Sequence, residues 1–442
     1  MDDLGLPSVF RVGEFAARSV AAAHTRAAEL LAARNGVAVP DVSVGVREAA
    51  IAFRSERYLR VDGEAAFEWA PLSGDYEAAD GWVRLHCNFE HHAEIACRVL
   101  GVPQEREAVE AALRRRGRFE VEDAIAEAGG VAAAMRTRDE WLAHEQSGAV
   151  AARPLAAIGP VAAASSAGGA SGAGGTGGAG RAELADRLGP STRPLAGVRV
   201  LDLTRIIAGP NAGRVLAGYG AEVTMVRSPS LPTIRGLDLD LNFGKALRFL
   251  DLRSAEGRAA FLDLVRGADI VLQSYRPGAL AALGLGAEEL AAVNPALVHV
   301  SISAYGTDGP WGGRRGFDSL VQMAVGIADE GMRAGGASRP VPLPAQVLDH
   351  GAGWWAAAGA VEALNRGGGL AVDVSLAGVA AALDALGRVE PAVGLAVADP
   401  ALSDVEDLLL RTPSAAGLLT HVRFPGSVAG AEFGWGGPPP IV

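Results

Sequence analysis

The stretch VRVLDLTRIIAGPNAGRVLAGYGAEVTMVR (residues 198–227) decides the fold. Its two apolar runs, VRVLDL (198–203) and EVTMVR (222–227), predict buried strands, and the segment between them predicts a helix. Further apolar runs and helical stretches alternate along the chain, with runs at 248–253, 269–274 and 297–303 and helices at 254–268 and 286–294. Strands that alternate with helices predict an α/β domain with an open parallel, Rossmann-like sheet, whose ligands bind beyond the carboxyl ends of the strands.

The composition of the 442-residue chain excludes several classes of protein. Lys plus Arg is 40 and Asp plus Glu is 51, and the formal net charge of −11 argues against nucleic-acid binding. No run approaches the roughly 18 apolar residues that a membrane span needs. The opening MDDLGLPSVF is acidic where a secretory signal is basic, and two cysteines give no disulfide framework, so we expect a cytoplasmic protein.

The N-terminal part has a different pattern. A helix at 10–34 and a strand with a helix at 42–53 precede a strand at 82–87 and several short helices, which together predict a small α+β region. The Gly-, Ala- and Ser-rich run at 162–180 predicts a flexible linker. The predicted units are a helix-strand remnant of a large domain, a small domain, the linker, a large α/β domain and a return segment, at 1–58, 59–158, 159–186, 187–386 and 387–442.

A short motif occurs twice. The sequence DVS stands at 41–43 and again at 373–375, each time after a long helix with a glycine-containing turn and before an alanine-rich helix. Common helix-turn-strand patterns could produce this by chance, but the matching order on both sides favours a duplication.

Several motifs occur together in one order: PLAGVRVLDLTRIIAGPNAGRVLAGYGAEV (194–223), NFGKALRFLDLRSAEGR (242–258), GFDSLVQMAVG (316–326) and VLDHGAGWWAAAGAVEAL (347–364). This ordered set resembles the class III CoA-transferase (CaiB/BaiF) family. The N-terminal part and the tail at 418–442 resemble the remainder of the same family, so the two halves stand in swapped order. Our hypothesis is a tandem fusion with two deletions that together leave one complete unit.

The resemblance implies an enzyme that moves CoA between an acyl-CoA thioester and a carboxylic acid through an aspartyl anhydride and an aspartyl thioester. It implies Asp318, in the GFD motif, as the nucleophile. The residues alone also allow Asp318 to be only the cap of the helix that follows it. The resemblance further implies a homodimer, with acyl-CoA and an acceptor acid as partners and with no tightly bound cofactor, metal, nucleic acid or membrane.

Candidate CoA contacts follow from three motifs. Arg205, Ala208, Gly209 and Pro210 lie where a helix begins after the first strand, and a helix N-terminus can bind a diphosphate. Lys245, the only lysine of the chain, could meet a phosphate as a compact ammonium. In SYRPG, Ser274 ends a strand, Tyr275 could stack on adenine and Arg276 could pair with phosphate. Each motif also has a purely structural alternative. The helix start could be only a tight turn, Lys245 a solvated surface charge, and SYRPG an ordinary Pro-Gly turn.

Two other functions stay open. An α-methylacyl-CoA racemase would need a histidine directly before Asp318, where this chain has Phe317, although Asp349 matches the second acid of such enzymes. Departures such as Ile207 and Arg227 at places where the family has polar or acidic residues would suit a non-catalytic CoA-binding homologue. The cluster His86, Cys87, His91, His92 and Cys97 lacks the short spacing of a zinc site.

Overall fold

A computed structural model of the protein describes residues 4–66, 69–161 and 177–442. Its centre is a seven-stranded sheet of order β10-β9-β8-β11-β12-β13-β7. The strands are β7 (Ala156–Pro160), β8 (Arg199–Asp202), β9 (Glu222–Arg227), β10 (Lys245–Phe249), β11 (Ile270–Gln273), β12 (Val298–Ser303) and β13 (Leu370–Ser375). All neighbours pair in parallel except β13 and β7. The predicted Rossmann-like sheet is confirmed, and its order reverses between β8 and β11.

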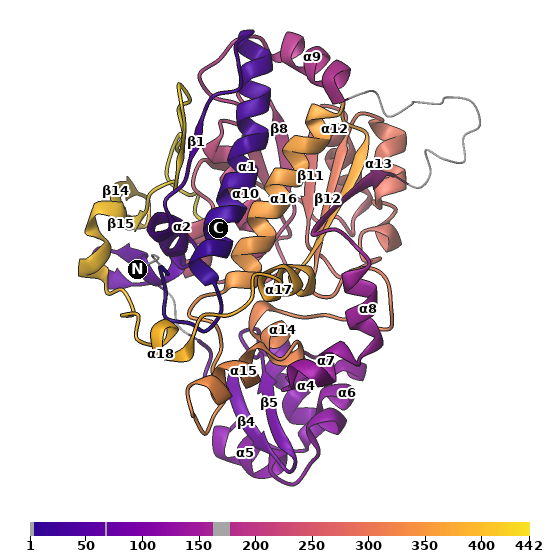
Figure 1. The fold of residues 1–442 in the computed structure, drawn as a ribbon. Coiled ribbons are helices and arrows are strands. Elements are labelled where there is room, and N and C mark those ends of the chain that lie inside the picture. The colour runs from indigo at the N-terminus through magenta and orange to yellow at the C-terminus, as the bar shows by residue number, and fades with distance from the viewer. Residues whose placement is uncertain (1–3, 67–68, 162–176) are drawn as a thin grey trace.

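Helices cover both faces of this sheet (Figure 1). On one face α10 (Ala208–Gly218) and α16 (Val347–Asn365) pack on alternate strand residues such as Val200, Ile270 and Val300. On the other face α12 (Ala255–Val265) and α13 (Ala287–Val293) cover the intervening residues, such as Leu201 and Val271. The helix α1 (Val12–Asn35) packs outside α16, which is therefore buried on nearly every side. This explains why α16 is rich in alanine and glycine rather than amphipathic.

Strand β10 lies a few residues earlier in the chain than the sequence predicts. We expected a strand at 248–253, but β10 begins at Lys245 and ends at Phe249. The strand is at the edge of the sheet and its Phe249 side chain is exposed, so the apolar run does not mark a buried strand there. Pairing of Lys245 with Val223 of β9 sets the register instead.

The small domain has its own sheet and core. Its strands β4 (Gly74–Ala78), β5 (Gly81–Leu85) and β6 (Ala132–Ala134) pair antiparallel. They pack against α4 (Glu90–Leu100), α5 (Arg106–Leu113) and α6 (Arg118–Glu127) around buried Val83, Val109 and Ile125. The predicted α+β character is confirmed. The domain meets the rest of the molecule at α14 (Asp318–Ala324), where the Arg136 N–H donates to the Met323 carbonyl at 3.0 Å.

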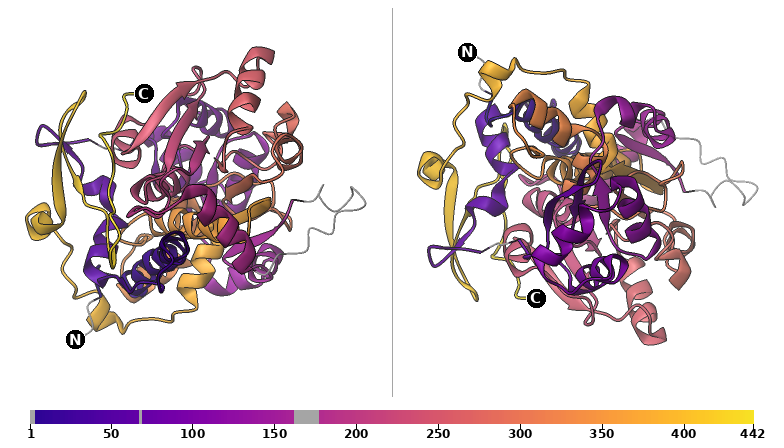
Figure 2. Two further views of the ribbon diagram at one scale, coloured as in Figure 1. Left: turned by 90° about the horizontal axis from the view of Figure 1, so that it is seen from above. Right: turned by 90° about the horizontal axis from the view of Figure 1, so that it is seen from below.

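The N-terminal half is built into the C-terminal half at several places. β7 extends the central sheet, β1 (Val42–Ser43) pairs with β16 (Ser427–Val428), and a four-stranded sheet of order β14-β15-β2-β3 joins both ends of the chain (Figure 2). Its strands are β2 (Arg60–Val61), β3 (Glu64–Ala65), β14 (Leu409–Ser414) and β15 (Gly417–Val422). Two halves without contact would have contradicted the tandem-fusion hypothesis, which stays a prediction.

The predicted linker at 159–186 is wrong at its end. Residues Gly177–Leu188 form helix α9, and part of the run, 162–176, lies outside the described residues. The helix is stabilised by tertiary packing: Leu184 and Ala185 are buried, and the Arg181 guanidinium pairs with Glu29 of α1 at 2.9 Å.

The remaining helices are α2 (Val46–Ala52), α3 (Ser55–Tyr58), α7 (Arg138–Leu142), α8 (Glu145–Ala151), α11 (Arg235–Leu241), α15 (Ile327–Ala334), α17 (Leu376–Asp384) and α18 (Pro391–Gly394), with short 3-10 helices at Ala281–Leu283 and Leu402–Leu408. Throughout the described ranges, no helix combines the length and apolar character needed to cross a bilayer.

Candidate active site

A cavity of about 350 Å³ lies at the carboxyl ends of β8, β11 and β12, where the strand order reverses. Its walls are the loop 205–208, the SYRPG turn and Ser303-Ala304, with Phe89, His91 and His92 of the small domain opposite. We call it the switch-point pocket. Parallel α/β sheets bind ligands at this place because the loops after neighbouring strands diverge there and leave a crevice.

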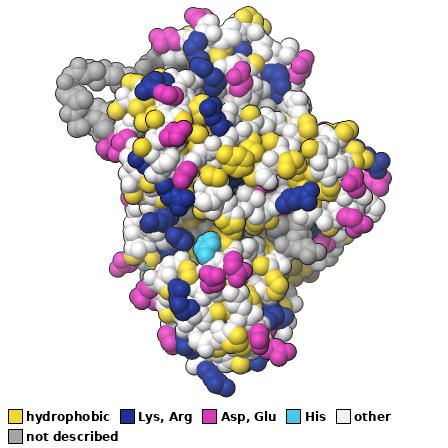
Figure 3. All heavy atoms as spheres, turned by 180° about the vertical axis from the view of Figure 1, so that it is seen from behind, with side chains coloured by type: hydrophobic (Ala, Val, Ile, Leu, Met, Phe, Trp, Pro, Cys, Tyr) yellow, Lys and Arg dark blue, Asp and Glu magenta, His cyan; other side chains and the backbone are white. Residues whose placement is uncertain are grey.

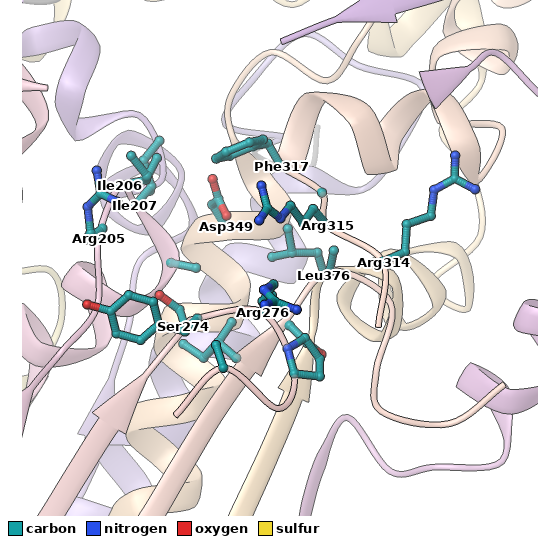
Figure 4. Close-up of a pocket in the computed structure, with 18 of the residues that line it drawn as sticks. Arg205, Ile206, Ile207, Ser274, Arg276, Arg314, Arg315, Phe317, Asp349 and Leu376 are labelled. Atoms are coloured by element: carbon teal, nitrogen blue, oxygen red, sulfur yellow. The ribbon is translucent and has the colours of Figure 1, made fainter. Parts of the chain in front are cut away.

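Four arginines line the switch-point pocket: Arg205, Arg276, Arg314 and Arg315. Figure 4 shows Asp349 beside Arg315 and Phe317, while Arg314 points away from them. Asp349 is the one acid of the lining, and Arg276 has no ion pair or hydrogen bond from its guanidinium within the described residues. On the face in Figure 3, a histidine at the junction of the upper and lower parts has basic side chains on one side and acidic side chains on the other. The pocket is therefore suited to a polyanion, although the whole chain is acidic.

The structure brings five of the eight predicted CoA contacts into this pocket. Arg205, Ala208, Ser274, Tyr275 and Arg276 line it. The Arg205 guanidinium also lies 5.1 Å from the centre of the Phe89 ring and donates to the Pro232 carbonyl, which fixes its position at the wall. Gly209 and Pro210 are buried in the first turn of α10, away from the lining, so they hold the turn rather than face a ligand.

Lys245 does not contact the pocket, and its predicted role is wrong. Its Nζ donates to Asp202 Oδ2 (2.8 Å), the Pro210 carbonyl (2.8 Å) and Asn242 Oδ1 (3.0 Å). An ammonium has three hydrogens, and all are used inside the protein. Burial lowers the pKa of Lys245, and the Asp202 carboxylate opposes that shift. The lysine ties β10 to β8 and α10, so its substitution would break a buried ion pair rather than a phosphate contact.

The loop after β8 carries backbone strain. Ile206 has a φ of 75°, in the left-handed region that a β-branched residue rarely adopts. The loop is held by Arg227, whose Nη1 donates to the Thr204 carbonyl at 2.6 Å and whose Nη2 binds Asp238. Arg227 therefore has a structural partner set and does not line the pocket. Strain of this kind is typical of functional loops, and here it turns Ile206 and Ile207 toward the site.

A second cavity, of about 290 Å³, lies between the two halves of the chain. The N-terminal half contributes Glu56, Arg57, Arg60, His86 and Asn88 to its wall. The C-terminal half contributes Asp318 and four residues that also line the switch-point pocket, namely Ile206, Ile207, Phe317 and Asp349. We call this cavity the inter-half pocket. Asp349 and Phe317 are thus at the boundary of the two pockets.

Asp318 supports the start of α16. Its Oδ2 accepts the backbone N–H groups of Leu348 (2.7 Å) and Asp349 (3.0 Å), and its Oδ1 accepts Gln322 Nε2 at 2.5 Å. Asp318 therefore caps α16 and not its own helix α14. The alternative that Asp318 is only the cap of the helix that follows it is wrong. Burial raises the pKa of Asp318 to about 6, against the lowering effect of these three hydrogen bonds.

Asp349 is the third residue of α16 and lines both pockets. Within the described part of the chain, its carboxyl group has no hydrogen-bond partner. Burial and the nearby Asp318 charge raise the pKa of Asp349 well above its usual range. Because Asp318 has three N–H donors and Asp349 has none, the charge of this pair resides on Asp318 and the proton on Asp349.

A family model described as CoA-transferase family III matches residues 37–168 and 195–389. The chain belongs to this family. The match includes both halves, so the N-terminal half is part of the CoA-transferase family III sequence and not an unrelated fusion partner.

Curated relatives of this family III chain are named as CoA-transferases. It is 36% identical over 174 residues to the probable fatty acyl-CoA transferase Rv3272 of Mycobacterium tuberculosis, which covers 36% of this chain and 44% of that protein. It is 37% identical over 203 residues to the succinyl-CoA–D-citramalate CoA-transferase of Chloroflexus aurantiacus, with 42% and 49% covered. A crystal structure of Rv3272 superposes with a TM-score of 0.41 at 35% identity, over 44% of this chain and 57% of that one. The chain spans half or less of the length of these curated relatives.

Two site residues of this family III protein were missed by the sequence reasoning. The Glu56 carboxylate meets His350 Nε2 at 2.9 Å, directly behind Asp349. Burial opposes ionisation of Glu56, but the charge and hydrogen bond of His350 lower its pKa. Because a carboxylate only accepts, His350 donates this hydrogen bond from Nε2. No sequence signal marked Glu56, which lies 294 residues from His350 along the chain.

The second missed residue is His86. Its ring stacks on Phe317, with centroids 3.8 Å apart and planes 8° apart, so the small domain places an imidazole beside the GFD motif. Three of the eight histidines fall at 86–92, and this concentration is the sequence signal that could have indicated a site here. Among the described residues, no three His, Cys, Asp or Glu side chains lie together in a way that could hold a metal ion.

Proposed function

We propose that the protein is a CoA-transferase that moves CoA from an acyl-CoA thioester to a carboxylic acid. One observation carries the proposal: the buried carboxyl group of Asp349, which has no hydrogen-bond partner in the described ranges, lies between an arginine-lined pocket and a second cavity. The switch-point pocket suits the polyanionic CoA, and the inter-half pocket suits the acyl group and the acceptor acid. The names of the relatives from Mycobacterium tuberculosis and Chloroflexus aurantiacus support the same reaction type.

The geometry favours Asp349 over Asp318 as the nucleophile. Both oxygens of Asp318 accept hydrogen bonds from N–H groups of the protein, whereas the Asp349 carboxyl has none within the described residues and lines both pockets. The raised pKa of Asp349 makes its ionised form a stronger nucleophile, and attack requires that form. The identification of Asp318 as the nucleophile stays a prediction of the sequence, and the experiment below separates the two.

The steps balance with one carboxylate. Asp349 first loses its proton to solvent, and its carboxylate then attacks the thioester carbonyl. The C–S bond breaks to give a mixed anhydride and CoA thiolate. The thiolate attacks the aspartyl carbonyl and releases the first acid, leaving an aspartyl-CoA thioester. The acceptor carboxylate attacks this thioester, and the thiolate then attacks the acyl carbonyl of the new anhydride, which gives the new acyl-CoA and restores Asp349.

Mass spectrometry tests this proposal. The protein incubated with an acyl-CoA should gain the mass of a covalent adduct, and peptide mapping should locate it on Asp349. Asp349→Asn should form no adduct, while Asp318→Asn should still form some. An adduct on Asp318 would restore the sequence prediction. If the protein binds CoA but no acyl-CoA gives an adduct or transfer, the result would support a non-catalytic CoA-binding homologue.

A racemase-like activity is the second candidate, because His86 stacks on the Phe317 that stands where a racemase would have its histidine. Burial lowers the pKa of His86 to about 3, so its imidazole is a weak base, and this ranks the racemase below the transferase. Deuterium uptake at the α carbon without transfer of CoA would reverse that ranking. The homodimer and the cytoplasmic location stay predictions of the sequence.

A further inference from the structure

The proposed attack by Asp349 requires hydrogen-bond donors for the acyl oxygen. When a carboxylate adds to a thioester, the carbonyl oxygen takes up a negative charge that donors stabilise. The two backbone N–H groups at the start of α16, those of Leu348 and Asp349, already donate to Asp318 Oδ2. The loop after β8 contributes only the apolar side chains of Ile206 and Ile207 to the inter-half pocket. The candidates are therefore the polar side chains elsewhere in the lining of this pocket.

Ser319 has a buried hydroxyl group at the inter-half pocket. The residue follows Asp318 in the first turn of α14, lines the cavity together with Asp349 and is 5% exposed. Its Oγ has no hydrogen-bond partner within the described residues. A hydroxyl group always has a hydrogen to donate, and burial of that donor without an acceptor is unfavourable. The position therefore favours a ligand atom that accepts a hydrogen bond.

His86 is a second buried donor at the same cavity. The residue is 4% exposed, and neither ring nitrogen has a hydrogen-bond partner in the described part of the chain. Burial lowers the pKa of His86 to about 3, so the ring is neutral at ordinary pH and one of its nitrogens has a hydrogen. The stack on Phe317 holds this imidazole beside the residue that precedes Asp318 and Ser319.

Ser319 and His86 differ from the other polar residues of the pocket. Among the described residues that line it, only these two have a fully buried side-chain nitrogen or oxygen without a partner. Buried polar groups in folded proteins are nearly always paired, so two exceptions at one cavity are a specific signal. Both donors are neutral. A cation in their place would favour the ionised form of Asp349 and oppose the raised pKa of that residue.

We propose that Ser319 and His86 are catalytic residues that donate hydrogen bonds to the acyl carbonyl oxygen while Asp349 attacks. A bond forms between an Asp349 oxygen and the carbonyl carbon, and the electron pair of the C=O double bond moves to the oxygen. The Ser319 O–H and a ring N–H of His86 stabilise this oxyanion without giving up a proton. The C=O bond then re-forms as the C–S bond breaks and the thiolate leaves. This inference rests on the proposed transferase function and adds two residues to it.

The rate of adduct formation on Asp349 tests Ser319. The probe is the fastest of acetyl-CoA, propionyl-CoA and succinyl-CoA at saturation, followed by rapid quenching and mass spectrometry. Ser319→Ala should slow the adduct about 10²-fold and leave the Kd of the acyl-CoA within about twofold, because the donor acts mainly in the transition state. Ser319→Thr should recover part of the rate. Ser338→Ala, the same change at an exposed position, should preserve it.

His86 is tested in the same assay with two variants. His86→Phe preserves an aromatic ring to stack on Phe317 but removes the donor, and adduct formation should slow about 10²-fold. His86→Gln restores an N–H group and should recover part of that loss. Melting temperatures report whether each variant is folded. A folded Ser319→Ala or His86→Phe variant with the full rate would overturn the inference.

Vibrational spectroscopy separates the two proposals, because it needs no turnover. Acetyl-CoA with an isotope label at the thioester carbonyl carbon is bound to Asp349→Ala, which forms no anhydride. The two donors should lower the carbonyl stretching frequency below that of free acetyl-CoA, and addition of Ser319→Ala and His86→Phe should restore it. This result without any CoA transfer by the unaltered protein would uphold the two donors and overturn the proposed function. Transfer by the unaltered protein with an unshifted carbonyl would uphold the function and overturn the two donors.

Discussion

The helix-turn-strand-helix motif of this chain occurs once as α1-β1-α2 and once as α16-β13-α17. The second copy has a six-residue strand paired in parallel with β12 inside the central sheet. The first copy has a two-residue strand that pairs antiparallel with β16. The two long helices pack on each other, and Arg26 contacts the equivalent glutamates of both, Glu29 at 2.9 Å and Glu362 at 3.5 Å. The same local pattern thus forms strand β13 of the central sheet in the second copy and the short two-stranded pair of β1 with β16 in the first.

The two copies also differ in chemistry. Aligned on Glu29 and Glu362, Ala16 and Ala17 stand opposite Asp349 and His350. The first copy therefore lacks the carboxyl group and the imidazole of the site. It contributes by packing, and its continuation supplies Glu56 to the back of His350. We infer from this difference that the first copy stabilises the second, which carries the site residues.

The largest expected effect lies in the second copy. Asp349→Asn should lower CoA transfer by at least about 10³-fold, because an amide cannot form the anhydride. Glu14→Gln, in the first turn of α1, is the matched control and should leave the transfer rate unchanged, since the ion pairs of Glu14 with described residues are those with Arg11 and Arg18 near the surface. Steady-state rates measure both. Comparable losses in the two variants would mean that the first copy has chemistry of its own.

The contact between the copies should contribute most to stability. Phe15 of α1 is buried, and a Cβ on Gly351 of α16 would lie 2.8 Å from its ring, so the two helices approach closely there. Phe15→Ala should lower the free energy of unfolding by about 3–5 kcal/mol, through lost burial and a cavity. Urea unfolding measures this difference. A loss below about 1 kcal/mol would show that the first copy is dispensable for packing.

The support of His350 should matter less than the nucleophile. Glu56→Gln preserves a hydrogen-bond acceptor but removes the charge beside His350, and kcat should fall by at most about 10²-fold through misplacement of Asp349. The pH profile of kcat should shift as well, because the negative charge of Glu56 behind Asp349 is lost. If kcat and its pH profile both match the unaltered protein, Glu56 has no positioning role.

The raised pKa of Asp349 predicts a pH-dependent stability. An acid whose folded pKa lies above its unfolded value stabilises the fold at low pH, and this stability is lost as the pH rises from the unfolded pKa through the raised folded pKa. Asp349→Asn lacks this group, so its melting temperature should exceed that of the unaltered protein at pH 8 and match it near pH 3. No equivalent change should follow Glu14→Gln. A lower melting temperature at pH 8 would contradict the buried, protonated Asp349.

The smallest effect should come from the ionic bridge between the copies. Arg26 has a side chain that is 41% exposed, and surface ion pairs contribute little because water screens them. Arg26→Gln should therefore cost less than about 1 kcal/mol in the free energy of unfolding. A loss comparable to that of Phe15→Ala would mean that the copies are held together by charge.

The sequence predicted the elements well where the pattern is local. The runs at 198–203 and 222–227 became β8 and β9, and SYRPG became a turn at the pocket, because strand periodicity and Pro-Gly turns depend on neighbouring residues. Lys245 shows the limit. From the sequence, a single lysine at the start of a strand is expected to be a surface charge. Only the tertiary structure, which places it against Asp202 and Pro210, shows that it is buried.

The sequence by itself determined the parallel α/β sheet, the small α+β domain and the family, since these depend on periodicity and on motifs in a fixed order. Only the tertiary structure decided that Asp349 lines both pockets while Asp318 supports it, and that Glu56 and His86 reach the site from the other half. The physical reason is the range of the interactions. Strands and turns arise from neighbours in the chain, whereas the site arises from hydrogen bonds and ring contacts between segments hundreds of residues apart.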